Sequence, residues 1–282
     1  MALRKKKNPA PERNRARGGN GGAESTVILN LDGAIATITL NRPERRNAIT
    51  PEMMDELEQA LNDCVIGRAR VVVLTGAGTA FSGGMDIATL RAGVGMPAKK
   101  HLADARRLAR LLKKLYSFPL PTIAAVNGPA IAGGCGIATL CDFTLASPSA
   151  SFGYTEVNIG FIPAMVSVFL WRQVGDRRVR ELLLSGHVLS AREAHRIGLI
   201  SEVVADGHKL LLRAYELANS LISHSPTALG RMKSLLQQLM GLELDEALEA
   251  AARASVQQRQ TKDYAEGLSA FLEKRKPVWR GE

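Results

Sequence analysis

Hydrophobic residues follow two different spacings along the chain. Between positions 27 and 40, apolar and β-branched residues cluster or alternate on either side of Asp32-Gly33, a dipeptide that favours a tight hairpin turn. Further on, short uninterrupted apolar runs are typical of strands buried on both faces; they lie at 70–75, 122–126 and 143–146. The first half of the chain therefore predicts a hairpin followed by a sheet of buried strands.

Helical spacing separates these runs and replaces them after about residue 160. Thr50-Pro51-Glu52 supplies an N-cap, a proline at the first helical position and an acidic first turn, and a second helical pattern covers 98–117. This alternation predicts an α/β domain with crossover connections. Further amphipathic stretches make the C-terminal third helical; they span 164–174, 176–185, 190–197, 209–223, 226–239, 243–257 and 262–274.

The chain divides into three parts by composition. Its 282 residues suffice for one large core and an appended helical segment, so we expect an α/β core at 25–200 and a helical region at 201–282. Residues 1–24 hold about half of the net charge of +10 and are nearly free of apolar residues. Such a segment cannot offset its ordering entropy by burial and is predicted to be disordered. A solvated tail is favoured over an RNA-binding arm or an organelle presequence.

Several classes of protein are disfavoured by what the sequence lacks. No apolar stretch approaches the roughly 18 residues that a membrane span needs, and the chain begins with charge where a signal peptide needs an apolar run. Cys64, Cys135 and Cys141 form no C-x-x-C pair, and the five histidines are scattered. We therefore expect a soluble cytoplasmic protein with no disulfide framework and no metal.

Glycine-rich turns are the candidate binding elements. The turn at 76–81 has Phe81 where a dinucleotide fingerprint needs a third glycine, and 128–135 lacks the lysine and hydroxyl of a phosphate loop. The turns at 81–86 and 128–136 each lead into a helical pattern, and helix N-termini present unpaired N–H groups that bind a developing oxyanion if two such turns converge. On the glycines alone, tight turns against a close-packed sheet are the favoured interpretation.

Six motifs in a fixed order change that interpretation. They are Asn41-Arg-Pro-Glu-Arg-Arg-Asn-Ala48, Phe81-Ser-Gly-Gly-Met-Asp-Ile87, Asn127-Gly-Pro-Ala-Ile-Ala-Gly-Gly-Cys135, Phe152 to Pro163, Ala191 to Ile200, and Glu266 to Pro277. Together they resemble the crotonase (enoyl-CoA hydratase/isomerase) superfamily over residues 27–279. The resemblance implies a spiral of ββα units with a C-terminal helical trimerisation region, assembled as a homo-trimer or hexamer. It also implies an enzyme of fatty acid metabolism that acts on coenzyme A thioesters and needs no separate cofactor.

The resemblance also implies roles for individual residues. The N–H groups of Met85 and Gly133 would form an oxyanion hole for a thioester carbonyl, and Glu156 matches a catalytic carboxylate. The apolar residues around Glu156 would raise its pKa toward the working range of a general acid or base, although an unpaired glutamate is by default a surface residue. The residues expected to bind CoA or substrate are Arg45, Arg46, Ala48, Gly83, Asp86, Ile87, Gly134, Gly136, Gly160, Phe271 and Lys274.

One departure from the family's pattern affects the predicted reaction. Two-carboxylate hydratases carry a second glutamate three residues after the oxyanion-hole glycine, and Gly136 stands there in this chain. Ala88 likewise stands where some relatives have a lysine for the CoA phosphates. A single carboxylate favours moving a double bond from the 3- to the 2-position, because Glu156 alone could carry the proton. Hydration stays possible if Glu156 does both proton transfers or if a carboxylate distant in sequence replaces the missing one. A non-catalytic CoA- or RNA-binding protein on the same scaffold is the alternative.

Overall fold

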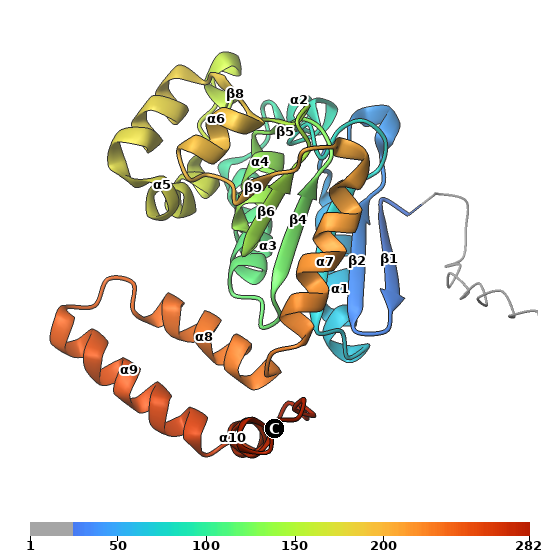
Figure 1. Ribbon diagram of the computed structural model, residues 1–282. Helices are drawn as coiled ribbons and strands as arrows, with labels where there is room; N and C mark the ends of the chain where they lie inside the picture. Colours follow the sequence, from blue (N-terminus) through green and yellow to red (C-terminus); the bar gives the residue numbers. More distant parts are fainter. Residues whose placement is uncertain (1–24) are drawn as a thin grey trace, which may run out of the picture.

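A computed structural model describes residues 25–282, and the predicted disordered tail at 1–24 lies outside them (Figure 1). Its centre is a six-stranded sheet in the order β1-β2-β3-β4-β6-β9. The bounds of these strands are β1 Val27–Asp32, β2 Ile35–Leu40, β3 Val71–Gly76, β4 Thr122–Val126, β6 Phe143–Ala146 and β9 Glu202–Val203. A smaller sheet joins β5 (Ala130–Ile131), β7 (Ser151–Gly153) and β8 (Val188–Ser190).

The predicted hairpin and buried strands are confirmed. β1 and β2 pair antiparallel from Val27↔Leu40 to Asp32↔Ile35, and Gly33 in the turn has a φ of +57°. β2, β3, β4, β6 and β9 are parallel neighbours, and every residue of β3 and β4 is buried. Strands covered on both faces need apolar side chains at every position, which is why these segments are continuous apolar runs.

Helices cover both faces of the large sheet (Figure 1). Their bounds are α1 Pro51–Ile66, α2 Ile87–Gly93, α3 Ala98–Tyr116, α4 Gly133–Leu140, α5 Ala164–Ser185, α6 Ala191–Arg196, α7 Leu210–Ile222, α8 Pro226–Gln238, α9 Leu244–Arg259 and α10 Lys262–Leu272. Short 3₁₀ helices are η1 Pro43–Arg45, η2 Glu156–Ile159 and η3 Gly207–Lys209. On β3, Val72 and Leu74 belong to the core under α1, α3 and α4, while Val71 and Val73 belong to the core under α7. Alternate residues of a strand point to opposite faces, so one strand serves both cores.

Two local signals placed helix boundaries as expected. The Thr50 side chain accepts a hydrogen bond from the N–H of Met53 at 3.2 Å, which caps α1. α5 is broken at Gly175, whose φ of 78° and ψ of 166° are not helical, so the two predicted stretches at 164–174 and 176–185 are two helices in one element. The expectation of a purely helical C-terminal third was incomplete. β8 and β9 lie there, and strands of two or three residues are too short to show an alternating pattern.

Past residue 200 the chain first completes the sheet and then leaves it. β9 pairs with β6, and α7 packs on β3 and β4, whereas α8, α9 and α10 extend away from the sheet (Figure 1). The division at residue 200 stays a prediction about folding units. Large apolar side chains on α8–α10 are exposed; they include Met232, Leu236, Leu244, Leu248, Val256, Leu268, Phe271 and Leu272.

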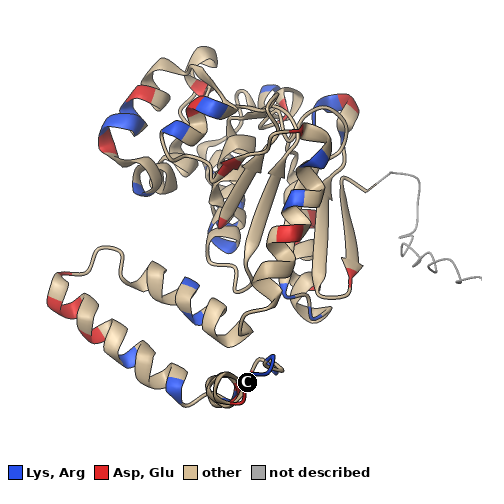
Figure 2. Cartoon of the chain, in the orientation of Figure 1, with Lys and Arg blue, Asp and Glu red and all other residues tan. Residues whose placement is uncertain are grey.

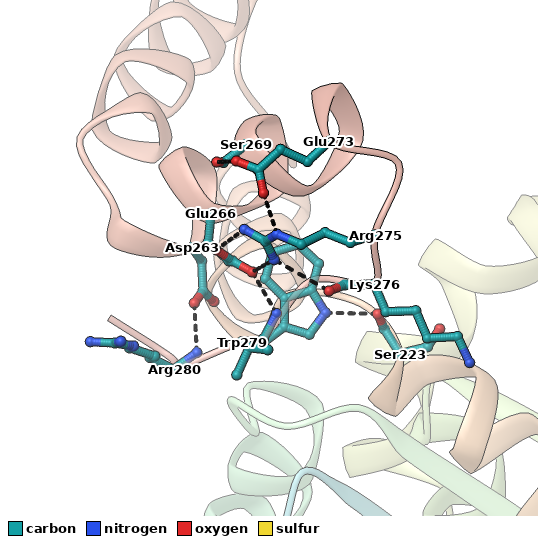
Figure 3. A network of polar contacts seen from close by, with 10 residues as sticks. Ser223, Asp263, Glu266, Ser269, Glu273, Arg275, Lys276, Trp279 and Arg280 are labelled. Carbon is teal, nitrogen blue, oxygen red and sulfur yellow. Dashed lines mark hydrogen bonds and ion pairs between the residues drawn. The ribbon is translucent and has the colours of Figure 1, made fainter.

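A buried carboxylate, that of Asp263, fastens the end of the chain to the start of α8. Figure 3 shows its contact with Arg280. Asp263 is 1% exposed and accepts hydrogen bonds from the hydroxyls of Ser225 at 2.7 Å and Thr227 at 3.1 Å. It also accepts from the backbone N–H groups of Arg280 at 3.0 Å and Gly281 at 3.1 Å. We call this arrangement of Asp263 and its four donors the C-terminal clasp. Burial alone raises the pKa of Asp263, but these donors outweigh it and hold the pKa below its usual value.

Charges of both signs are interspersed over the described part of the chain (Figure 2). In α9, Asp245 and Glu246 lie in the first turn and Arg259 in the last, which complements the helix dipole. Among residues 25–282, no helix is both long and apolar enough to span a bilayer.

Candidate active site

Two turns meet at the N-terminal end of α4. In the first, Ile49 pairs in parallel with Met85: the N–H of Ile49 donates to Gly84 O at 2.7 Å, and the N–H of Asp86 donates to Ile49 O at 2.9 Å. In this parallel pairing Ile49 bonds to the C=O of Gly84 and the N–H of Asp86, the residues on either side of Met85. The N–H of Met85 therefore points away from Ile49. In the second, Gly133 is the first residue of α4, where an N–H has no partner inside the helix.

The two predicted donor residues lie side by side. A Cβ built on Gly133 would be 4.0 Å from Met85 Cγ and 3.5 Å from Ile49 Cδ1. The pairing of Ser82 with Ala130, together with a 2.9 Å hydrogen bond from Ile131 N to Ser82 O, fixes one turn on the other. The structure thus makes neighbours of the two residues whose N–H groups are expected to form an oxyanion hole.

The residues before each donor have unusual backbone angles. Gly84 has a φ of +86°, and Ala132 has a φ of 51° with a ψ of −126°, a region that residues with a Cβ rarely occupy. Ala132 is held there because its N–H donates to Gly153 O at 2.7 Å. Backbone strain of this kind costs about 1–3 kcal/mol and orients the peptide that follows.

Glu156 enters the same region from the small sheet. β7 pairs with β5, Ile131 opposite Gly153, and η2 begins at Glu156 three residues after that pair. The Oε2 atom of Glu156 is buried and has no hydrogen-bond partner within residues 25–282. Burial raises the pKa of Glu156, its own N–H lowers it slightly, and no charged side chain of the described part contributes. This carboxyl group is therefore suited to exchange a proton with a ligand.

Glu156 also acts on its buried neighbours. Burial raises the pKa of Cys135 to about 12, and the negative charge of Glu156 adds to the effect. The same charge contributes to the raised pKa of Tyr154, whose main cause is again burial. Cys135 belongs to α4, the helix that also carries Gly133. The flanking residues differ from expectation in part, because Phe152 is fully buried but Ile159 and Phe161 are 61% and 53% exposed.

A cavity of about 540 Å³ opens beside the first donor turn. The predicted site residues that line it are Arg45, Arg46, Ala48, Gly83, Met85, Asp86 and Ile87. Ala88 lines it too, together with Arg45 of η1 and Arg46, which follows η1 as its C-cap. A wall with several guanidinium groups suits a ligand that carries phosphates.

Arg42 is a site residue that the sequence analysis did not single out. Its Nη1 donates to Ala48 O at 2.7 Å and to Asp86 Oδ2 at 3.1 Å, and it lines the same cavity. Burial raises the pKa of Asp86, but the N–H of Thr89 and the Arg42 pair outweigh it, so this pKa lies below its usual value. The sequence signal that could have identified Arg42 is its place in the same short segment as Arg45 and Arg46.

The remaining predicted residues are spread over three places. Gly134 and Gly136 lie in α4, where a Cβ at Gly134 would be 2.6 Å from Ser82 Cβ, so this helix packs too closely for a side chain. Gly160 ends η2 with a φ of 72°. Phe271 lies in α10 and Lys274 just after it, and neither lines the cavity, so the fold of this chain does not bring them to the site.

The family is decided by a match over nearly the whole described chain. The sequence model of the family described as enoyl-CoA hydratase/isomerase matches residues 30–282. The chain belongs to the enoyl-CoA hydratase/isomerase family. It is therefore an enzyme of a family that acts on CoA thioesters, and the crotonase resemblance in the sequence is confirmed.

Known members of the enoyl-CoA hydratase/isomerase family match over their full length. A Thermus thermophilus protein, provisionally named an enoyl-CoA hydratase, is 44% identical over 246 residues, which are 87% of this chain and 97% of that protein. The short-chain-enoyl-CoA hydratase of Clostridium acetobutylicum is 34% identical over 255 residues, 89% of this chain and 96% of the relative. The solved structure of an enoyl-CoA hydratase from Shewanella pealeana superposes with a TM-score of 0.86 at 32% identity, covering 90% of this chain and 96% of that one. The predicted α/β crotonase fold is confirmed.

Proposed function

We propose that this enzyme binds an acyl-CoA thioester at the two donor turns and uses Glu156 to move a proton on its acyl chain. The buried, unpartnered Oε2 of Glu156 carries this proposal, because a carboxyl oxygen shielded from water without a partner is costly unless a ligand uses it. The thioester carbonyl oxygen would accept from the N–H groups of Met85 and Gly133. Negative charge grows on that oxygen when a proton leaves C2, so two fixed donors stabilise the enolate more than the substrate.

Within the family's chemistry we favour isomerisation of a 3-enoyl-CoA to a 2-enoyl-CoA. The ionised Glu156 takes a proton from C2, which gives a dienolate, and then returns the same proton to C4. The double bond moves by one position, and the carboxylate is regenerated. One group with a raised pKa serves both steps because it is a stronger base than an ordinary glutamate and still a competent acid.

Hydration of a 2-enoyl-CoA is the second candidate, and the names of relatives favour it. The Clostridium acetobutylicum relative is a short-chain-enoyl-CoA hydratase. Hydration adds a hydroxyl at C3 and a proton at C2, so Glu156 would have to deprotonate the water and deliver that proton to C2. Gly136 offers no second carboxylate in the turn of α4 that follows Gly133.

The CoA part of the substrate fits the cavity at η1. Arg42, Arg45 and Arg46 supply guanidinium groups for its phosphates, and Ala48, Gly83, Asp86 and Ile87 line the path toward the donor turns. Gly134 and Gly136 let α4 pack closely on Ser82 and Val166 beside the acyl end, and Gly160 would contact the acyl chain itself. Phe271 and Lys274 would contact CoA bound to a neighbouring subunit, and the exposed apolar side chains of α8–α10 fit a homo-trimer or hexamer. We expect the assembly in the cytoplasm. Light scattering of the full chain tests the oligomeric state; a monomer would contradict it.

Purified protein incubated with 3-enoyl-CoA and, separately, with 2-enoyl-CoA distinguishes the candidates. We expect turnover of 3-enoyl-CoA and a loss of about 10²–10⁴-fold in Glu156→Gln with CoA affinity retained. Glu249→Gln, an exposed glutamate of α9, is the control and should be fully active. Turnover of neither substrate, with CoA still bound, would refute both candidates and support a non-catalytic protein. Full activity of Glu156→Gln would refute the assignment of the base.

A further inference from the structure

Gly136 and Val166 are packed against each other with no free space between them. Gly136 lies one helical turn after Gly133 in α4, and Val166 lies in the first turn of α5 and is 4% exposed. A Cβ built on Gly136 would be 2.3 Å from Val166 Cγ1 and 3.3 Å from Val166 Cβ. Carbon atoms in van der Waals contact are about 3.5–4 Å apart, so no side chain fits at position 136 while Val166 stays where it is.

Val166 cannot move aside easily. A valine in a helix has one strongly preferred χ1 rotamer, so its methyl groups are not a flexible end that turns away. The first half of α5 is also fixed to its neighbours: Gln173 Nε2 donates to Thr139 O of α4 at 2.5 Å, and Phe169 packs on Tyr116 of α3 with ring centroids 5.1 Å apart. Moving Val166 therefore means moving α5 against α3 and α4.

This contact lies beside the proposed reaction site. Residues three apart in a helix lie on the same face, so a side chain at 136 would project on the side of α4 that presents Gly133. A valine methyl group fills that space, and a space lined by apolar groups holds no ordered water, which needs two to four polar partners. Hydration needs a water molecule and a proton-accepting group that holds it. The packing of Val166 on Gly136 leaves no room for the water and supplies no such group.

We propose that Val166 is a specificity-determining residue that keeps position 136 closed to a second carboxylate and to the water it would hold. The proton taken by Glu156 then returns to the carbon chain of the dienolate, and no hydroxyl is added at C3. Replacing Gly136 by glutamate would open the second reaction only if Val166 were shortened as well. The identity of the dienolate rests on the proposed function. The contact between Gly136 and Val166 rests only on the packing of α4 against α5.

The contact is tested by thermal unfolding of four variants beside the wild type. Gly136→Glu should lower the Tm by about 2–12 °C, because overpacking a tight core destabilises the folded protein. In Gly136→Glu with Val166→Ala, the added cost of the glutamate should fall, since the nearest atom is then Cβ at 3.3 Å. Val166→Ala alone completes the cycle. Gly136→Glu with Val168→Ala is the matched control, because Val168 is 52% exposed on the same helix and should give no relief.

The reaction is tested by assaying the same proteins with 3-enoyl-CoA and 2-enoyl-CoA. We expect the Gly136→Glu, Val166→Ala double variant to hydrate 2-enoyl-CoA about 10²-fold faster than the wild type, the order of magnitude of one positioned acid or base. Gly136→Glu alone and its Val168→Ala control should gain no such activity.

Three outcomes would overturn the role of Val166. They are a wild-type protein that hydrates 2-enoyl-CoA as fast as the double variant, a Gly136→Glu variant that hydrates it without any change at 166, and a folded double variant that gains no hydration. Failure of the proposed function looks different, because the wild type would then turn over neither substrate. The gain of hydration in the double variant and the Tm cycle would still decide the inference in that case.

Discussion

Gly84 and Ala132, the residues that precede the two proposed oxyanion donors, are in direct contact. A Cβ on Gly84 would be 2.8 Å from Ala132 Cβ and 2.8 Å from Ile131 O. The two segments that carry Met85 and Gly133 therefore approach so closely that only the methyl group of Ala132 fits between their backbones.

Gly84→Ala should reduce kcat/KM by about 10²-fold, because a shift of about 1 Å in a donor is enough for a loss of that size. Gly95→Ala is the matched control: Gly95 has a similar φ of +82° but no atom within 4 Å of the added Cβ. Gly95→Ala should lower the free energy of unfolding by about 1–2 kcal/mol, the cost of a positive φ with a Cβ, and keep its activity. Equal losses of activity in the two variants would show that the contact does not position the donor.

Ala132→Gly should stabilise the protein. The present φ of 51° and ψ of −126° cost about 1–3 kcal/mol with a Cβ, and the entropy of an added glycine in the unfolded chain offsets roughly 0.5–1 kcal/mol of the relief. Urea unfolding should show a net gain of about 1 kcal/mol. Ala138→Gly, at a buried position inside α4, should instead lose about 1 kcal/mol. Destabilisation of both variants alike would mean that Ala132 is not strained.

Glu156→Gln should raise the Tm at neutral pH while it abolishes activity. Because burial raises the pKa of Glu156, this carboxyl group destabilises the fold once it is ionised. Its favourable contribution is complete below the unfolded-state pKa and disappears as the pH rises through the folded-state pKa. The difference in Tm between variant and wild type should therefore be small in acid and grow toward neutral pH. A constant difference across that range would contradict the raised pKa.

Asp263→Asn should destabilise α8–α10 selectively. The asparagine leaves some of four buried donors unpaired, at a cost of about 2–4 kcal/mol. Hydrogen exchange should increase in α8–α10 and stay unchanged in the large sheet. Asp104→Asn, on the exposed part of α3, is the control. In the wild type the depressed pKa of Asp263 means that the clasp is stable above pH 4 and weakens as the pH falls through the folded-state pKa. Uniformly faster exchange across the sheet would contradict a local role.

The sequence predicted those parts of the molecule whose causes are local. The hairpin turn at Gly33, the cap at Thr50 and the break at Gly175 each depend on the conformational preferences of one or two residues. The strands β8 and β9 were missed because they exist only through pairing with β7 and β6.

In the candidate site, too, local features could be predicted from the sequence and long-range contacts could not. Motifs assigned Met85, Gly133 and Glu156, and the fold places the first two side by side and the third on the adjoining segment. The ion pair of Arg42 with Asp86 and the packing of Val166 on Gly136 join residues 30 or more positions apart. Contacts of that range depend on how helices and turns pack, which neither periodicity nor spacing reveals.

The three buried cysteines can report local opening of the native protein. Burial raises the pKa of Cys64, Cys135 and Cys141 to about 12, so at neutral pH only roughly 10⁻⁵ of each is thiolate while the core is closed. A thiol-reactive dye would therefore label molecules only when α1 or α4 separates from the sheet. The rate at which each cysteine is labelled would measure how often the surrounding part of the native protein opens locally.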